Sequence, residues 1–351
     1  MFVPRASGEE YRVALLWSES TRMETSPEDS PSGIPSGGVL VAAGSDTVAS
    51  FSPATGTLFS RSLRHDFFSV SPRFYLNQPY APGGRWVLTD RFNGERHFID
   101  YHGMPRLFGP VLAQFGIDEI VMNHPEHVRG VSLHAGMTLT AFDLVTIPGS
   151  NDRRALAARA DVFGDLHLSE IDFPRARVEE RGVLQTGTIV YGLAIVPGAS
   201  TSEVLILRGT DPQVLELYRM GESIEDDPFL RFPVAPENRV HTPPVIRRVN
   251  GDRFAVRLRD VILLVDRRTS AVQTIARDGE APVAGFLPAW TLGLAYAEAG
   301  ENDACIILTE TLQEDSPTLE WCFPGSTVAA LEADLLVLER QDRFFAIGVE
   351  R

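Results

Sequence analysis

Short runs of apolar residues, each about the length of one β-strand, follow one another along nearly the whole chain. Turn-forming residues interrupt these runs about every 8 to 12 positions, which is the spacing of successive strands in all-β folds. The best candidate for a helix, residues 152–159, covers only about two helical turns. The pattern therefore predicts an all-β protein.

Residues 260–275 predict the repeating unit, which is a strand, a polar corner and a second strand. The corner reads Asp266-Arg-Arg-Thr269-Ser270, and residues 46–59 repeat the same hairpin earlier in the chain. We expect further copies of the hairpin at residues 95–107, 131–139, 168–178, 204–215 and 305–321.

Hairpins that recur about every 40 residues, with other strand-like runs between them, are typical of a β-propeller built from four-stranded blades. Their number favours seven or eight blades in a single domain, residues 1–351. The last repeat, residues 326–351, supplies three strand-like runs, and the N-terminal run 11–17 is a spare strand. We expect this strand to pair with the C-terminal blade, which would close the ring and leave no unpaired edge.

The polar corners resemble those of the quinoprotein-like (PQQ-type) repeat propellers, whose blades carry an Asp, two residues and then Thr-Gly. Asp266-Arg-Arg-Thr269-Ser270 and Ser52-Pro-Ala-Thr55-Gly56 match this corner, each with one departure. The resemblance implies the fold and not the cofactor, so no cofactor is predicted. Such WD40/PQQ-like propellers include dehydrogenases, outer-membrane assembly scaffolds and many proteins without a known activity.

Two stretches interrupt the rhythm of the repeats. Residues 18–38 are rich in Ser, Pro, Gly and Glu, and are expected to form a mobile excursion. Residues 221–236 are first acidic and then rich in Pro, which indicates an insertion between blades. This insertion is either a solvated linker or a docking loop that presents Phe229, Leu230 and Phe232 to a partner.

Charge and composition exclude several classes of function. The net charge of −15 opposes nucleic-acid binding, because phosphates must be neutralised by basic residues. The chain contains no Lys, which removes Schiff-base enzymes, P-loop NTPases, protein kinases and Ser-x-x-Lys acyl enzymes. No apolar run approaches the roughly 20 residues that span a bilayer. Residues 1–5 lack a signal peptide, so we expect a cytoplasmic protein unless the N-terminus is a processed or truncated exported form.

Acidic residues are expected to gather where the second and third strands of each blade connect, at one face of a propeller. The candidates for partner binding on this face are Asp46, Asp90, Asp260 and Glu298, together with Asp161. Such an acidic ring could bind a cation, an amine or a basic protein surface. The alternative is that these residues are ordinary solvated loop positions of an acidic protein.

Residues His124, Glu126 and His127 form the densest cluster of side chains that bind metals. Two His and one Glu are a suitable ligand set for a catalytic zinc or another divalent cation. Pro125 excludes a regular helix interior, so the geometry of an H-E-x-x-H site is not available. Solvent-exposed histidines in a loop are the alternative.

The chain has two cysteines, Cys305 and Cys322. Symmetrical pairing of their strands places Cys305 opposite Cys322, while Ile306, Leu308 and Trp321 share the apolar face. In an oxidising compartment the pair could form a cross-strand disulfide, and in the cytosol both would remain thiols.

These observations favour a non-catalytic scaffold that binds a protein partner, because no catalytic motif stands out and propellers host their function in variable loops. The alternative is a propeller enzyme, a hydrolase, lyase or oxidoreductase, with a metal-assisted site of acidic and His residues at the mouth of the channel. The oligomeric state stays open.

Overall fold

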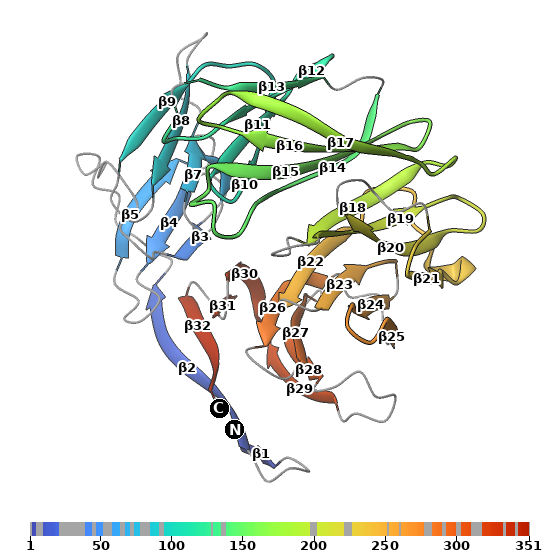
Figure 1. The fold of residues 1–351 in the computed structure, drawn as a ribbon. Helices are drawn as coiled ribbons and strands as arrows, with labels where there is room; N and C mark the ends of the chain where they lie inside the picture. Colours follow the sequence, from blue (N-terminus) through green and yellow to red (C-terminus); the bar gives the residue numbers. More distant parts are fainter. Residues whose placement is uncertain are drawn as a thin grey trace. The chain divides into compact units, whose positions relative to one another are not determined.

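The computed structural model consists of β-strands, with no α-helix in the residues whose secondary structure it describes (Figure 1). Side chains are described for residues 74, 76, 85–90, 95–127, 129–134, 138–196, 202–220, 227–244, 246, 253–259, 261–274, 322–326, 337–340, 343, 345 and 347. For the other strands only the backbone pairing is given.

Four consecutive sheets in the middle of the chain each have four antiparallel strands that pair in chain order. Sheet one contains β10 (Met104–Phe108), β11 (Val111–Phe115), β12 (Glu119–Asn123) and β13 (Val131–His134). Sheet two contains β14 (Leu139–Thr146), β15 (Arg154–Asp161), β16 (Asp165–Asp172) and β17 (Arg177–Gln185). Sheet three contains β18 (Val190–Val196), β19 (Ser202–Arg208), β20 (Val214–Met220) and β21 (Leu230–Pro233). Sheet four contains β22 (Val245–Asn250), β23 (Arg253–Arg257), β24 (Val261–Asp266) and β25 (Ala271–Ala276).

Four further sheets come from the two ends of the chain. Two have four strands: β6 (Phe67–Val70), β7 (Phe74–Asn77), β8 (Trp86–Asp90) and β9 (Arg96–Ile99), and then β26 (Val283–Ala289), β27 (Gly293–Ala299), β28 (Asp303–Thr309) and β29 (Thr318–Pro324). One has three: β3 (Val39–Ala43), β4 (Thr47–Phe51) and β5 (Leu58–Leu63). The assigned strands thus form eight successive sheets, which is the blade architecture of a β-propeller, as predicted.

The remaining sheet joins the beginning and the end of the sequence. It contains β1 (Phe2–Pro4), β2 (Glu10–Ser20), β30 (Thr327–Glu332), β31 (Leu335–Arg340) and β32 (Arg343–Glu350). β2 runs antiparallel to β32, with Val13 opposite Val349 and Ser20 opposite Arg343. The prediction that the N-terminal strand completes the C-terminal blade is confirmed.

The chain divides into two compact units, which we describe separately. Unit 1 contains residues 1–68, 89–96 and 278–351, and unit 2 contains residues 69–88 and 97–277. Sheets one to four belong entirely to unit 2. The organisation of residues 1–351 as a single domain stays a prediction.

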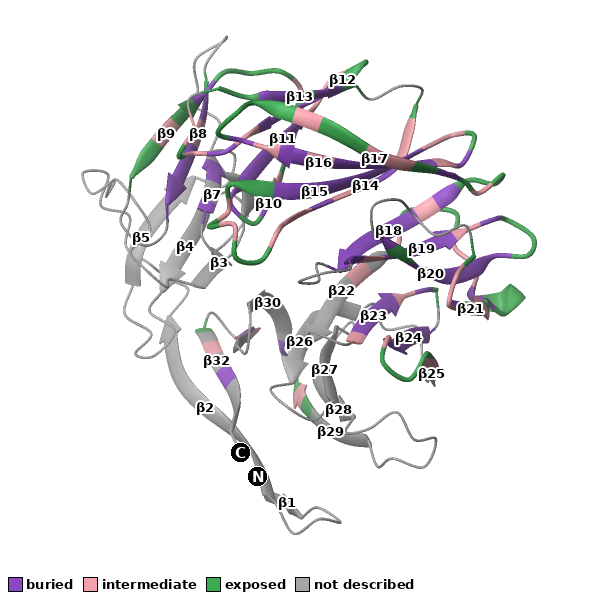
Figure 2. Cartoon of the chain, viewed as in Figure 1, coloured by how far each residue is buried: buried purple, intermediate pink, exposed green. Residues whose placement is uncertain are grey.

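The core of unit 2 consists of apolar layers between neighbouring sheets. One layer combines Leu166 and Leu168 of sheet two with Val204 and Ile206 of sheet three, all of them buried. A middle strand such as β24 is therefore buried on both faces, which explains why its sequence is continuously apolar instead of alternating. The outermost strand β17 is mostly exposed and polar (Figure 2).

Four of the predicted hairpins within these sheets are confirmed. Residues 260–275, 168–178, 204–215 and 305–321 each form two adjacent antiparallel strands. In the first of them Asp266 pairs with Ala271, which leaves the predicted four-residue corner between the strands. In the copy at 46–59, β4 pairs with β5, while its corner lies outside the described residues.

Two of the predicted hairpins are wrong. Residues 95–107 and 131–139 are not hairpins, because β9 and β10, and likewise β13 and β14, belong to different sheets. The polar corners at these positions are links from one blade to the next. Residues 152–159, the best helix candidate in the sequence, agree with the all-β prediction, since β15 pairs with both β14 and β16. The sheet overrides the helical propensity of the Ala-rich sequence, because burial of Ala155, Ala157 and Ala160 on both faces requires an extended chain.

The two predicted interruptions have different outcomes. Residues 18–20 belong to β2, and 21–38 lie outside the described residues. Within 221–236, residues 221–226 are also outside the description, but Leu230–Pro233 form β21 and pair with β20. The second half of this stretch is therefore the outer strand of a blade and not an insertion. Leu230 is 5% exposed, because it packs into the core of unit 2.

Candidate functional site

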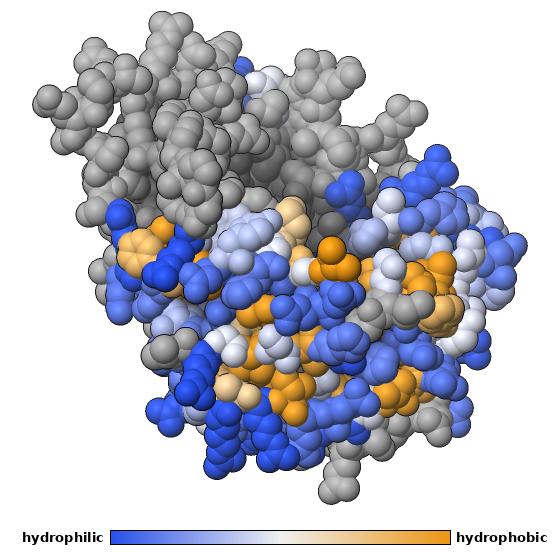
Figure 3. All heavy atoms as spheres, turned by 90° about the horizontal axis from the view of Figure 1, so that it is seen from above, coloured by the Kyte–Doolittle hydropathy of each residue, from blue (hydrophilic) through white to orange (hydrophobic). Residues whose placement is uncertain are grey.

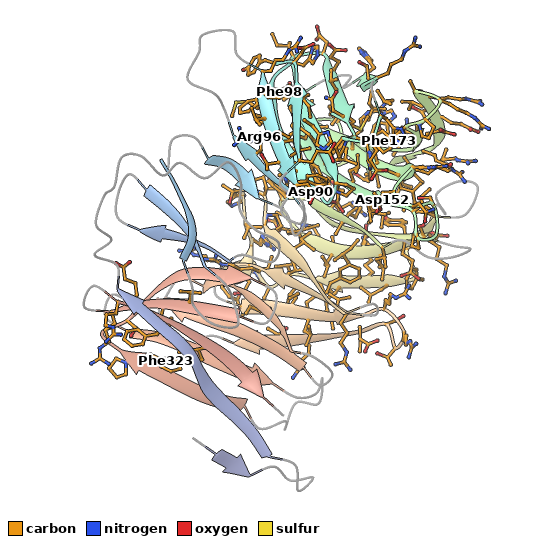
Figure 4. All side chains as sticks on the ribbon, turned by 90° about the vertical axis from the view of Figure 1, so that its left-hand side faces the viewer. Asp90, Arg96, Phe98, Asp152, Phe173 and Phe323 are labelled. Atoms are coloured by element: carbon orange, nitrogen blue, oxygen red, sulfur yellow. The ribbon has the colours of Figure 1, made fainter. Side chains whose placement is uncertain are left out.

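Each sheet of unit 2 has two edges formed by turns, which we name the link edge and the corner edge. The link edge carries the turns between second and third strands and the links between sheets. There Thr186 N–H donates to the carbonyl of Gly164 at 3.0 Å, which ties a link to the turn beside it. The corner edge carries the other turns, and there Phe173 N–H donates to the carbonyl of Arg153 at 3.0 Å. Figure 4 labels Phe173 together with Asp152, which belongs to the facing turn.

The link edges of neighbouring sheets lie on the same side of unit 2. The link between β9 and β10, residues 100–103, and the link between β17 and β18, residues 186–189, have four residues each. Four residues reach at most about 14 Å, whereas a strand of seven residues is about 23 Å long. Such links are too short to carry the chain from one edge of a sheet to the other.

The predicted acidic residues do not share one face. Asp161 ends β15 and lies at the link edge, as expected for a second-to-third connection. Asp90 instead ends β8, which is the third strand of its sheet, and its backbone N–H donates to Glu95 O at 2.9 Å. It is also only 3% exposed. Its placement on the predicted face is wrong, because repeat boundaries taken from the sequence were displaced by one strand. Of the other candidates, the side chains of Asp46, Asp260 and Glu298 lie outside the described residues.

The histidine cluster lies at the corner edge and is packed instead of solvated. His124 is 1% exposed, and its Nδ1 accepts a hydrogen bond from Glu126 N–H at 3.2 Å. The rings of His124 and His127 are 5.0 Å apart, and both contact Phe173 of the next sheet. The cluster therefore joins sheets one and two. Metal binding by His124, Glu126 and His127 stays a prediction.

The link edge presents large apolar side chains at the tips of its turns. Ile117, in the turn between β11 and β12, is 95% exposed. Phe163, in the equivalent turn of the next sheet, is 61% exposed. Three more exposed apolar side chains lie on or beside the links, namely Tyr101, Met104 and Ile189. In Figure 3 hydrophobic residues likewise interrupt a hydrophilic surface on one face of the molecule.

Acidic side chains accompany both turn tips. Asp118 and Glu119 directly follow Ile117, are exposed, and form no ion pair with any described residue. Asp161 and Asp165 stand on either side of Phe163. Each tip therefore combines an exposed apolar side chain with two carboxylates. We name this set the acidic tips, made of residues 117–119 and 161–165.

The turn at Phe163 is held in a defined conformation. Asp161 Oδ1 accepts hydrogen bonds from Phe163 N–H at 2.9 Å and Asp165 N–H at 3.0 Å. Gly164 has φ of +84°, and a Cβ there would lie 2.1 Å from the carbonyl oxygen of Thr188. The backbone can follow this path only with glycine. The exposed phenyl ring is therefore presented from a rigid turn.

Among the described residues, one group of three side chains brings metal-binding atoms within 4.8 Å of one another: Asp161, Asp165 and His167. Two of these side chains also contact other groups of the protein. Asp161 Oδ1 accepts the two turn hydrogen bonds, and His167 Nδ1 lies 3.5 Å from Glu180 Oε2. The group contains residue types that can bind a metal ion, and it lies at other positions than the predicted His124, Glu126 and His127.

A buried carboxylate lies inside sheet three. Glu216 is 0% exposed, and its oxygens contact Arg208 Nε at 2.5 Å, Arg231 Nε at 3.2 Å and the Tyr218 hydroxyl at 2.8 Å. Burial and the hydrogen bond to Glu216 raise the pKa of Tyr218. The hydrogen bond to Glu216 likewise raises the pKa of Arg208 above its usual value. Each charge has a partner, so this network stabilises the blade and provides no reactive group.

The two aromatic residues proposed for docking, Phe229 and Phe232, are half-buried. Both pack against the core between sheets three and four. The guanidinium of Arg219 lies 4.7 Å from the centre of the Phe229 ring. Their packing explains the apolar sequence of this stretch. A role for them in partner binding stays a prediction.

The strand register around the cysteines is the predicted one, with Cys305 opposite Cys322 and Ile306 opposite Trp321. Cys322 is disulfide-bonded. Cys305 is the only other cysteine in the sequence.

The acidic tips were not among the predicted sites, although the sequence contains a pattern that indicates them. In Gly116-Ile117-Asp118-Glu119 and in Asp161-Val162-Phe163-Gly164-Asp165 a large apolar residue stands in a glycine-containing turn beside acids. Turns normally carry small polar residues, because their side chains face water. An Ile or Phe at the tip of a short turn is therefore itself an indication of contact with a partner.

Comparisons with known proteins support the fold. No family model matches the sequence, and no curated protein matches it. Among solved structures, dihydro-heme d1 dehydrogenase NirN in complex with DHE matches with a TM-score of 0.54 and 11% identity, over 82% of this chain and 64% of that chain. Hydrazine synthase of Kuenenia stuttgartiensis matches with a TM-score of 0.49 and 10% identity, over 80% and 94% of the two chains.

The WD40 domain of Neurospora crassa Pan2 also matches, with a TM-score of 0.46 and 10% identity, over 96% and 95% of the two chains. At such low identity the likeness to NirN shows the β-propeller fold alone. A search of the described residues finds no helix long and apolar enough to cross a membrane.

Proposed function

We propose that this β-propeller is a protein-binding scaffold without catalysis of its own, and that its partner docks on the link edge of unit 2. The observation that carries the proposal is the pair of acidic tips on neighbouring sheets. A 95% exposed Ile leaves its apolar surface in water, which contributes nothing to folding. Covering that surface with a partner removes it from water and favours binding.

The charge of the acidic tips defines the partner. Asp118 and Glu119 form no ion pair within the described part of the chain, so their charges are available to a basic surface. The net charge of −15 adds a long-range attraction for a cationic partner. We therefore describe the partner as a protein segment that combines Lys or Arg with apolar side chains. The two kinds of side chain would contact the acids and the turn tips, respectively.

The rigidity of the turns favours binding further. Gly164 and the two hydrogen bonds to Asp161 fix the turn at Phe163 before any partner arrives. A side chain presented from an ordered turn loses little conformational freedom on binding, which lowers the entropic cost of association. Exposed aromatic and aliphatic anchors of this kind dominate the binding energy of many interfaces.

The test is affinity capture from native lysate with the full chain, followed by mass spectrometry. Three baits are compared: the natural protein, the double variant I117S/F163S, and the control V183S, which removes an exposed apolar side chain from the outer strand β17. We expect a reproducible partner on the natural protein and on V183S, and at least a tenfold loss on the double variant. The absence of a reproducible partner, or equal capture by all three baits, contradicts the proposal.

The charge component is tested separately on the captured partner. D118N/E119Q removes two exposed carboxylates without changing the shape of the turn. We expect slower association and a weaker dependence of affinity on salt, because rim charges mainly steer the encounter. An affinity that does not change with salt in the natural protein would contradict a basic partner.

A second candidate function rests on the group Asp161, Asp165 and His167. As a metal-assisted hydrolase, lyase or oxidoreductase, the protein would use these side chains to bind a divalent cation. The test is calorimetric titration of the full chain with Zn²⁺, Mn²⁺ and Mg²⁺, repeated with H167Q. Binding below about 10 µM that H167Q abolishes supports the enzyme, whereas equal weak binding by both proteins contradicts it.

A further inference from the structure

A cavity of about 450 Å³ lies among the first strands of sheets one to four. Its walls come from β10, β14, β18 and β22, together with the end of β11 and the two prolines that precede β22. All of these residues belong to unit 2. The volume falls in the range of about 300 to 1,000 Å³ that small-molecule sites occupy.

Most of the residues that line the cavity are apolar, while polar atoms form the larger part of its exposed wall. Phe115 and Phe142 meet edge to face with ring centres 5.2 Å apart, which fixes both rings. Leu139, Leu193 and Ile246 supply aliphatic surface on the other walls. A ligand in this cavity can therefore place an apolar body against these side chains.

Three of the four polar side chains in the walls already serve the fold. The Thr140 hydroxyl donates to the carbonyls of Ala160 and Asp161, at 3.2 Å each. Asp143 Oδ2 accepts a hydrogen bond from Ile195 N–H at 2.8 Å, which ties sheet two to sheet three. The hydroxyl of Tyr191 lies 3.3 Å from the hydroxyl of Thr210, a residue that does not line the cavity.

The fourth polar side chain, Arg106, is different. It lines the cavity and is exposed, and it forms no ion pair with any described carboxylate. Its guanidinium stacks 4.8 Å from the centre of the Phe108 ring, which orients the planar group without neutralising its charge. An Arg held in this way presents a fork of N–H donors that suits a carboxylate or sulfonate.

We infer that this cavity is a binding site for a small organic anion with an apolar body, and that Arg106 recognises the anionic group. The ring edges of Phe115 and Phe142 contact the body of the ligand, while the guanidinium contacts its charge. In a protein of net charge −15, Arg106 gives this cavity a cation that forms no ion pair with a described carboxylate, and this cation favours an anionic ligand. The inference does not depend on the protein partner.

Two fluorescent probes of the same skeleton test the inference. 8-Anilinonaphthalene-1-sulfonate carries an anionic group, whereas N-phenyl-1-naphthylamine has the same rings without the charge. Each is titrated into the full chain, into R106Q and R106K, and into the control R129Q, which removes an exposed Arg at the corner edge. The double variant I117S/F163S is included to exclude binding at the acidic tips.

We expect saturable binding of one sulfonate probe per chain, weakened about tenfold by R106Q and largely retained by R106K. The neutral probe should bind R106Q as it binds the natural protein, and R129Q and I117S/F163S should change neither probe. Equal weakening of both probes by R106Q would overturn the inference, since Arg106 would then only shape the cavity. Unchanged sulfonate binding in R106Q, or its loss in I117S/F163S, would overturn it as well.

Discussion

Asp172 and Asp266 occupy the same position in two different blades. Each ends the third strand of its sheet, and each carboxylate accepts a hydrogen bond at 3.1 Å from the backbone N–H three residues later. In both corners the fourth residue after the Asp has a positive φ, 48° at Ala176 and 53° at Ser270. The recurring Asp thus braces the corner of the blade.

The positive φ values predict that glycine stabilises both corners. A left-handed conformation costs a residue with a Cβ about 1–2 kcal/mol, while glycine adds about 0.5–1 kcal/mol of unfolded-state entropy. We expect A176G and S270G each to raise the free energy of unfolding by about 0.5–1 kcal/mol in urea denaturation. T269G is the control and should lower it, because Thr269 does not have a positive φ. A decrease for both S270G and T269G would show that the corner has no such preference.

Asp266 predicts a dependence of stability on pH. Burial alone would raise its pKa, but hydrogen bonds from Thr269 N–H, Arg253 and Arg268 N–H outweigh burial, so the pKa of Asp266 lies below its usual value. A depressed pKa contributes stability above the unfolded pKa of about 3.9, and this stability is lost as the pH falls through the folded pKa. The gap in unfolding free energy between the natural protein and D266N should therefore be largest at pH 7 and shrink below about pH 4. A gap that is constant across this range would contradict the assignment.

The network around Glu216 predicts a strong contrast between its two arginines. R208Q removes Arg208, whose side chain is 17% exposed, from the fully buried carboxylate of Glu216. Breaking such a buried pair should lower the free energy of unfolding by about 3–5 kcal/mol. R231Q removes the other arginine, which is 62% exposed, and should cost less than about 1 kcal/mol. Equal losses of unfolding free energy for R208Q and R231Q, measured by thermal or urea denaturation, would contradict the expectation that the more buried arginine contributes more stability.

Two glycines on the link edge allow the stability cost of a steric clash to be distinguished from the cost of backbone strain. Gly164 and Gly187 both have positive φ, +84° and +68°, so Ala at either position is strained. A Cβ at Gly164 would lie 2.1 Å from Thr188 O, whereas one at Gly187 would have no neighbour within 4 Å. G187A should cost about 1–2 kcal/mol, and G164A should cost more because the turn must also shift. G164A should also weaken partner capture at Phe163, which G187A should leave unchanged.

The all-β class, the propeller rhythm and the pairing of β2 with β32 could be predicted from the sequence, because strand length and turn spacing are local properties. The assignment of each hairpin to a sheet could not. Around Asp100 a turn inside a blade and a link between blades read alike, since both are short polar segments between strands. The difference lies in which strand pairs with which, and this depends on contacts distant in sequence.

The candidate site depended on this assignment. With the strand count displaced by one, Asp90 was expected on the same face as Asp161, whereas it lies at the corner edge of its sheet, as does His124. His124 looked solvated because its neighbours are polar, but Phe173 of the next blade covers it. The apolar character of Ile117 and Phe163 does not by itself indicate that they are exposed. Exposure of an apolar residue at a turn tip is decided by the turn geometry, which composition does not show.

The pairing of β2 with β32 also sets an order of events during synthesis. Strands of the four-stranded sheets pair with the next strand in the chain, so each of these sheets can form soon after its own residues leave the ribosome. β2 pairs with β1 on one side, but its partner on the other side, β32, lies about 300 residues later in the chain. The sheet that contains β2 can therefore be completed only after β32 has been made.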